Sequence, residues 1–274
     1  MKKKDFKLML IAGHGQGDSG ACGNGHKECD ITRDLVNRIC KVAISKGILV
    51  DLYNPLYNAV KQIKAGNIPS FAGHTYCLEV HCNSSTNKTA RGSMFYIHKD
   101  EAGWRVEQNI LNRLYALGSR QAWDGVVKSN RQWESGLIVQ NRCKEQGVSH
   151  GLLETFFISN VDDVNWYFTN KDKIAEEIIN GIIEGFNIED TVTVVNETPV
   201  DTSYTNWIGT VVNCKELNIR SGAGMKYDIS RVIPVNINVE VFEEYYESPN
   251  KKWYHVKICD DVLGWVYSGY IQRV

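Results

Sequence analysis

Short apolar runs alternate with amphipathic stretches along the first 188 residues, and this alternation restricts the folds open to the chain. A short run of apolar residues is typical of a buried strand. Five runs fit this pattern, at residues 7–12, 48–52, 76–80, 93–98 and 148–156. Apolar residues at helical spacing predict helices at 28–46, 101–117 and 171–186. The order of these elements predicts an α/β fold with a mostly parallel central sheet flanked by helices.

The sequence pattern changes after Phe186. Residues 187–206 are polar and show no helical period, so we expect an exposed linker at 189–206. Residues 207–274 hold short alternating runs separated by turn signals, which predicts a small all-β barrel. The chain of 274 residues is therefore expected to form two domains, at 1–188 and 207–274.

Charge and hydropathy narrow the possible partners and location. The formal net charge is -1, which gives no electrostatic case for binding nucleic acid or an anionic membrane. The apolar run from Phe6 to Ala12 is too short for a signal peptide or a membrane span. We therefore expect synthesis in the cytoplasm, with release by another agent if the protein acts outside. Because the cytoplasm keeps thiols reduced, we expect the eight cysteines to be free buried thiols, and they include no C-x-x-C pair.

Four candidate catalytic residues lie where the predicted elements begin or end. His14 follows the first strand, His81 follows the third, Glu154 lies in the last, and Glu28 opens the first helix. Sites in parallel α/β sheets form beyond the carboxyl ends of the strands, so these side chains can meet there. Two histidines and one carboxylate are a familiar catalytic zinc set that leaves a fourth position for water. A second carboxylate can act as general base, and apolar neighbours would raise the pKa of Glu154 towards neutral pH.

Other residues compete for these roles when only residue type and position are considered. A histidine after a strand is often a hydrogen-bonded loop residue, and a glutamate that opens a helix is favoured by the helix dipole. His26 is two residues from Glu28, and His150 precedes the last strand and could face the cleft. Three thiols beside the proposed ligands could also bind zinc: Cys22, Cys29 and Cys82.

Three segments resemble motifs of the zinc-dependent N-acetylmuramoyl-L-alanine amidases found in bacterial autolysins, spore-cortex enzymes and phage endolysins. Residues 13–28 (GHGQGDSGACGNGHKE) are similar to the entry motif of that family. Residues 81–92 are similar to its second histidine motif, and residues 153–160 (LETFFISN) to its closing motif. The resemblance covers residues 6–186, and its strength lies in the order of the motifs at predicted strand ends.

The resemblance implies one zinc ion held by His14, Glu28 and His81. It implies that Glu154 is the general base and that the reaction cleaves a peptidoglycan amide bond. This bond joins the lactyl group of N-acetylmuramic acid to L-alanine of the stem peptide. Within the second motif we expect Asn83 and Arg91 to contact substrate. Cys82 departs from the family pattern, which often has alanine at this position.

The C-terminal segment resembles bacterial SH3-like domains. Residues 217–224 (LNIRSGAG) are similar to the signature turn of these domains, and residues 264–271 (GWVYSGYI) to their last strand. Aromatic rings with polar edges suit the binding of sugars or peptides. Four such residues are expected to contact the cell wall: Trp253, Trp265, Tyr267 and Tyr270. Aromatic residues also fill the cores of small barrels, and this alternative stays open.

These observations favour a peptidoglycan amidase, of the endolysin type, whose partner is the cell wall and not nucleic acid or a membrane. A zinc endopeptidase or carboxypeptidase could use the same metal set to cut within the stem peptide. A non-catalytic wall-binding protein is a third possibility. It is disfavoured because all four catalytic positions hold competent residues.

Overall fold

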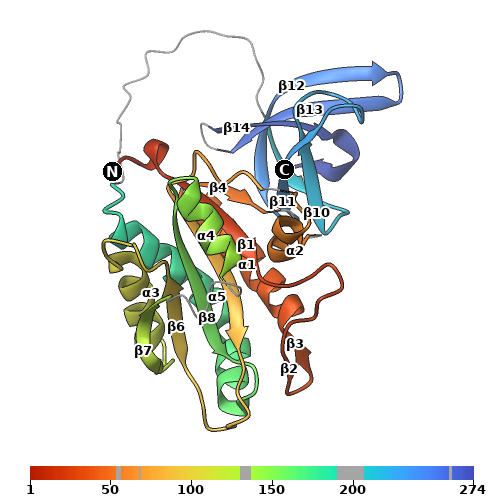
Figure 1. Cartoon of the computed structure of the whole chain (residues 1–274). Coiled ribbons are helices and arrows are strands. Elements are labelled where there is room, and N and C mark those ends of the chain that lie inside the picture. Colours follow the sequence, from red (N-terminus) through yellow and green to blue (C-terminus); the bar gives the residue numbers. More distant parts are fainter. Residues whose placement is uncertain (54–56, 68, 130–136, 190–206, 259–260) are drawn as a thin grey trace. The chain divides into compact units, whose positions relative to one another are not determined.

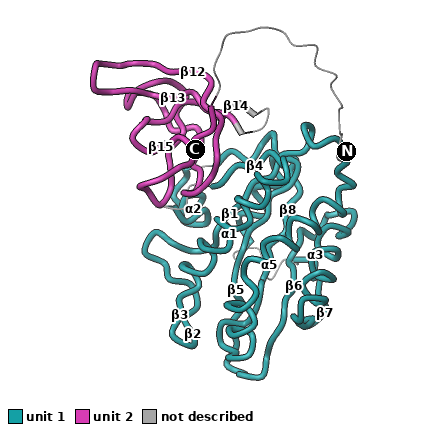
Figure 2. The backbone as a smooth tube through the Cα atoms, turned by 180° about the vertical axis from the view of Figure 1, so that it is seen from behind, with its two compact units in different colours: residues 1–189 teal, residues 190–274 magenta. Residues whose placement is uncertain are grey.

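The computed structural model describes residues 1–53, 57–67, 69–129, 137–189, 207–258 and 261–274 (Figure 1). The chain divides into two compact units, Met1–Glu189 and Asp190–Val274, which Figure 2 shows in different colours. The linker expected at 189–206 lies outside the described residues except for Glu189. Each unit is built around its own main sheet.

Six strands form the central sheet of the first unit. Their order is β4 (Leu49–Leu52), β1 (Lys7–Ala12), β5 (Tyr76–Asn83), β8 (Ser149–Phe157), β6 (Ser93–Ile97) and β7 (Gln121–Lys128). The first four strands are parallel, β6 pairs antiparallel with β8, and β7 runs parallel to β6. The sheet is therefore mostly parallel, which confirms the predicted α/β class. The sequence does not predict β7, because its residues are largely exposed and form no apolar run.

Helices cover both faces of this sheet. One face carries α1 (Glu28–Ser45), α3 (Arg105–Ala116) and α5 (Val161–Gly185), and the other carries α2 (Ala59–Lys64) and α4 (Ile138–Glu145) (Figure 1). Successive residues of a strand point to opposite faces. Leu78 and Val80 of β5 lie in the core beneath α1, α3 and α5. Glu79 and His81 therefore point to the face that carries α2 and α4.

The helix bounds differ from the sequence expectation at identifiable places. The helix α5 begins at Val161, ten residues before the predicted start, because Asn160 caps it by accepting hydrogen bonds from the backbone N–H groups of Asp162 and Asp163. The sequence does not predict α2 or α4, which have 6 and 8 residues. Helices this short span too few turns to show a helical period.

The second unit is an all-β sheet, as the sequence predicts. Its order is β11 (Ile229–Pro234), β10 (Glu216–Arg220), β14 (Asp261–Tyr267), β13 (Lys251–Ile258), β12 (Asn238–Ser248), β9 (Trp207–Val211) and β15 (Ile271–Arg273). All pairings are antiparallel. Alternate strand residues such as Leu217 and Ile219, or Val239 and Val241, are buried and form the core of this unit.

Free thiols are confirmed at Cys22, Cys29, Cys77, Cys82, Cys143 and Cys214. Cys259 lies outside the described residues. The prediction of burial is wrong for three of them. Cys22 is exposed in the small ribbon of β2 (Cys22–Gly23) and β3 (His26–Lys27), and Cys29 and Cys214 are half-buried. In the part of the chain that the structure describes, the helices are too short or too polar to cross a membrane.

Candidate metal centre

His14 lies in a tight loop directly after β1. Its φ is 63°, and Gly15 and Asp18 exchange backbone hydrogen bonds of 2.8 and 3.0 Å across the turn. The guanidinium of Arg33 donates hydrogen bonds to the carbonyl oxygens of Gly13 and His14, at 3.1 and 2.9 Å. Arg33 of α1 therefore anchors the backbone of this loop and so helps to fix the position of His14.

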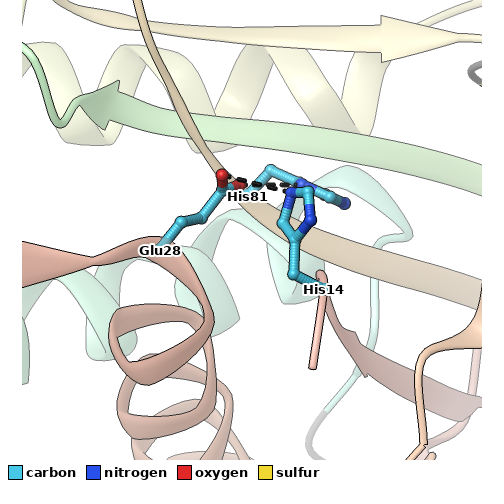
Figure 3. Close-up of side chains that lie close together, drawn as sticks. All are labelled: His14, Glu28 and His81. Carbon is cyan, nitrogen blue, oxygen red and sulfur yellow. Dashed lines mark hydrogen bonds and ion pairs between the residues drawn. The ribbon is translucent and has the colours of Figure 1, made fainter. Parts of the chain in front are cut away.

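Glu28, the first residue of α1, directs its carboxylate at both histidine rings, which lie next to each other with centroids 4.9 Å apart (Figure 3). Its Oε2 is 3.1 Å from His14 Nε2, and its Oε1 is 2.9 Å from His81 Nδ1. The backbone N–H groups of Ala21 and Cys82 also donate to this carboxylate, each at 2.9 Å. Four donors surround a side chain that is only 3% exposed, so its orientation is strongly determined.

The three side chains form a group that can hold a metal ion. One ligand atom from each of His14, Glu28 and His81 lies within 4.8 Å of the other two. Two imidazole nitrogens and one carboxylate oxygen are the donor set that zinc prefers in catalytic sites. The three residues therefore fit the zinc ion that the sequence implies.

The pKa values of the three residues depend on one another. Burial lowers the pKa of His81, but hydrogen bonds from its ring to the Glu28 and Glu79 carboxylates raise it well above 6.5. Burial lowers the pKa of His14, but its hydrogen bonds to Glu28 and Asp18 and the charge of Glu28 together raise it above 6.5. Burial acts against ionisation of Glu28, yet the two rings hold its pKa below the ordinary value of 4.5. Metal binding at this site must therefore displace protons from the imidazoles.

Glu154 lies beside this group on the neighbouring strand. In the sheet register it is the Cα partner of His81. It lines a cavity of about 460 Å³ together with His14, Asp18 and His81. Its Oε2 is buried and has no hydrogen-bond partner within the described residues. Burial raises the pKa of Glu154 to about 7, so the carboxylate can take up and release a proton near neutral pH.

Each candidate histidine ligand has a second carboxylate on its other ring nitrogen. Asp18 Oδ2 lies 3.0 Å from His14 Nδ1, and Glu79 Oε1 lies 3.2 Å from His81 Nε2. Burial would raise the pKa of Glu79, but hydrogen bonds from His150 and His81 lower it to about 2. The sequence motifs do not point to Glu79 as a site residue. The signal available was its spacing of two from His81 in a strand, which puts both side chains on one face.

The competing metal ligands lie elsewhere or are engaged. His26 packs on Phe168, with ring centroids 4.4 Å apart. His150 is buried in β8 and contacts Glu79. Cys82 points away from the site into the core, and burial raises the pKa of its thiol well above 9. Only a thiolate ligates metal well, so this thiol is unsuited to the role.

Asn83 and Arg91 of the second motif, which are expected to contact substrate, do not belong to the metal group. Asn83 is half-buried at the end of β5, and its side chain accepts a hydrogen bond from the N–H of Ser84 at 2.8 Å. Arg91 forms ion pairs with Asp162 and Asp163 at the start of α5, at 3.0 and 3.3 Å. Substrate contact by either residue stays a prediction.

The aromatic residues proposed to bind the wall differ in exposure. Trp253 is 2% exposed and donates from its indole N–H to Glu247, so it belongs to the core of the second unit. Trp265 is half-buried and stacks on His255 at 4.5 Å. Tyr270 is 38% exposed and lies against half-buried Tyr267. Tyr270 and Tyr267 thus offer more ring surface to a ligand than Trp253 does.

Gly13 leaves the space that the His81 ring occupies. A Cβ at this position would lie 2.4 to 2.6 Å from three atoms of that ring. We expect Gly13→Ala to rotate the His81 ring away from Glu28 and to weaken zinc binding at least about tenfold while the domain stays folded. Zinc affinity is measured by chelator competition, and folding by circular dichroism. Gly103→Ala is the matched control, because a Cβ there meets nothing within 4 Å. Wild-type zinc affinity in Gly13→Ala would contradict this role for Gly13.

Comparison with known proteins covers both units. Residues 8–184 match the sequence model of the N-acetylmuramoyl-L-alanine amidase family, and residues 215–272 match that of the bacterial SH3 domain. The probable autolysin PH of Staphylococcus aureus is 26% identical over an alignment 274 residues long, which takes in 86% of this chain and 54% of that protein. The N-acetylmuramoyl-L-alanine amidase LytC of Bacillus subtilis is 27% identical over 188 residues, which cover 64% of this chain and 34% of that protein. This chain thus spans about half the length of the first relative and about a third of the second.

A solved structure shares the fold of the first unit. The CwlD amidase from Clostridioides difficile, in complex with the GerS lipoprotein, has a TM-score of 0.56 and 20% identity. The match covers 67% of this chain and 100% of that one, and it shows likeness of fold alone. The family match extends over more than half of this chain and contains all three residues of the metal group. The chain therefore belongs to the N-acetylmuramoyl-L-alanine amidase family, and a bacterial SH3 domain follows its amidase domain.

Proposed function

We propose that this protein hydrolyses the amide bond between N-acetylmuramic acid and L-alanine of the peptidoglycan stem peptide, with one zinc ion as cofactor. The observation that carries the proposal is the position of Glu154 beside the group of His14, Glu28 and His81. Glu154 lines one cavity together with the two histidines of that group. Family membership supports the bond and the metal. A role as an endolysin that reaches the wall after release from the cytoplasm is part of the same proposal.

Each residue of the cavity then has a distinct task. His14, Glu28 and His81 would hold the ion, which would polarise the scissile carbonyl and make the attacking water more acidic. Glu154 accepts a proton from the attacking water on its carboxylate and delivers that proton to the leaving amide nitrogen. Its raised pKa suits both transfers, since a group that titrates near the working pH can accept and release a proton.

Product analysis on purified peptidoglycan tests the bond that is cut. We expect new amino termini of L-alanine, intact stem peptides by mass spectrometry, and no new reducing sugar ends. Glu154→Gln in the same preparation serves as the control for contaminating hydrolases. New reducing ends would show that a glycosidic bond is cut instead. Shortened stem peptides would favour a zinc endopeptidase or carboxypeptidase.

The second unit is proposed to hold the enzyme on the wall. A chain that ends at Glu189 keeps the whole first unit, including the hydrogen bond from Glu189 N–H to the Met1 carbonyl. We expect this shortened chain to cleave soluble muropeptides at about the wild-type rate, because the metal group lies wholly in the first unit. It should lose most of its binding to insoluble walls.

Wall binding is measured by co-sedimentation with both chains carrying Glu154→Gln, so that hydrolysis does not dissolve the wall during the assay. Equal co-sedimentation of the two chains would exclude the second unit as the anchor. A loss of muropeptide cleavage in the shortened chain would show instead that the second unit takes part in catalysis.

A further inference from the structure

A buried chain of three side chains lies behind the metal group. His81 Nε2 is 3.2 Å from Glu79 Oε1, and His150 Nε2 is 3.1 Å from Glu79 Oε2. Glu79 is 4% exposed and His150 is 2% exposed. A carboxylate is costly to bury unless it is paired and hydrogen-bonded, and the two rings together satisfy this nearly buried group.

Strand geometry fixes this arrangement. Glu79 and His81 are two residues apart in β5, so their side chains share one face of the sheet. His150 lies in the adjacent strand β8, where it is the Cα partner of Cys77. Cys77 is two residues before Glu79, so the side chain of His150 lies on the same face of the sheet as Glu79 and His81, and both rings reach one carboxylate. The chain of contacts is built into the sheet and not into a surface loop.

The directions of the hydrogen bonds follow from the donors available. An ionised carboxylate only accepts, so each ring must donate an N–H to Glu79. His150 Nδ1 is buried and has no partner in the described part of the chain, which places the proton of this ring on Nε2. His81 also donates from Nδ1 to Glu28 at 2.9 Å. If a metal ion displaced that proton, the Nε2–H accepted by Glu79 would remain, and the lone pair of Nδ1 would be directed at the position it shares with Glu28.

We propose that Glu79, itself held by His150, is a positioning residue that fixes the ring and the tautomer of His81, so that Nδ1 faces the metal. Outer carboxylates of this kind orient a ligating imidazole and strengthen its bond to the metal. This inference rests on the proposed zinc centre, but not on which bond of the wall is cut.

The partner of the other histidine shows why Glu79 matters more. His14 Nδ1 has Asp18 as its carboxylate, and the Asp18 side chain is 39% exposed. Water can replace a lost acceptor at an exposed site. The Glu79 side chain is only 5% exposed, so water replaces a lost acceptor less readily there and the His81 N–H is left without a good partner. We therefore expect a larger effect on metal binding from Glu79 than from Asp18.

The test is zinc affinity and the spectrum of the cobalt-substituted protein, each measured without substrate. Glu79→Gln replaces one acceptor oxygen by an amide nitrogen and so cannot accept from both rings. We expect a loss of zinc affinity of about 10- to 100-fold and a changed cobalt absorption spectrum. His150→Leu should also weaken zinc binding. His150→Gln, which keeps an N–H donor for Glu79, should restore part of it.

Glu107→Gln is the matched control. Glu107 is also 4% exposed, but it accepts from the hydroxyl of Tyr76 at 2.7 Å and contacts no metal ligand. We expect this variant to lower the melting temperature and to leave zinc affinity unchanged. The inference is overturned if Glu79→Gln binds zinc as the wild type does, or if Glu107→Gln weakens binding equally. If Glu79→Gln does not fold, equal zinc affinities of His150→Leu and the wild type overturn it. A wild-type protein that binds no zinc would overturn the metal centre itself.

Discussion

Replacement of Glu154 by glutamine is expected to lower kcat by about 10³-fold while zinc stays bound at wild-type affinity. The amide has the shape of the carboxylate but cannot accept the proton of the attacking water. Because Glu154 is not one of the three residues whose ligand atoms converge, its loss should leave the metal in place. The measurement is single-turnover cleavage of a muropeptide, paired with zinc content per chain.

The pH profile of the wild type provides a second check on Glu154. A general base acts only when it is ionised, so kcat/KM should fall tenfold per pH unit below its pKa. Burial raises this pKa from 4.5 to about 7 in the protein without metal, and a nearby cation lowers it again. The acid limb is therefore expected between these two values. If Glu154→Gln turns over like the wild type, or loses zinc, the residue is not the base.

Loss of Glu28 is expected to remove both zinc and activity. Its carboxylate contacts both rings and carries the charge that holds them, so Glu28→Gln should weaken zinc binding by at least about 10²-fold. Added zinc at high concentration should restore part of the turnover. Zinc affinity from chelator competition and rescue by added metal are the two measurements. A Glu28→Gln protein with wild-type zinc content would disprove the ligand set.

The sign of the pH effect on zinc binding follows from the same contacts. The pKa values of His14 and His81 lie above 6.5 in the protein without metal, whereas zinc requires neutral imidazoles. Protons therefore compete with zinc, and the apparent affinity should rise as pH rises through and above this value. In Glu28→Gln the rings lose their anionic partner, so their pKa values should fall, which NMR titration of the ring protons can follow.

The sequence predicts much of the first unit because its signals are local. Apolar runs identify β1, β5 and β8, and the helical period identifies α1 and α3. The residues His14, Glu28, His81 and Glu154 lie at ends of elements, where a parallel sheet brings distant segments together. Periodicity and topology thus indicate where in the sheet a site can form, and the resemblance to the amidase motifs selects these four residues from their competitors.

What the sequence does not predict depends on contacts between distant segments. The role of Glu79 as the partner of two histidines requires the register that sets β5 against β8, which no local pattern encodes. The same holds for Arg91, whose guanidinium pairs with two carboxylates 71 and 72 residues further along the chain. Trp253 and Tyr270 have the same aromatic character in the sequence, and only packing separates the buried ring from the exposed one.

The reversed direction of β6 has a consequence for how the domain can vary. Because β6 runs against β8, Met94 at its beginning is the Cα partner of Glu154, whereas Ile97 at its end pairs with Gly151 further from the metal group. The segment 84–92, which precedes β6, therefore lies at the end of the sheet that carries the metal group. The segment 98–104, which follows β6, lies at the opposite end. Insertions in the second segment can accumulate without touching the chemistry. Changes of length in the first would fall at the end of the sheet that carries the metal group, where they can alter the chemistry.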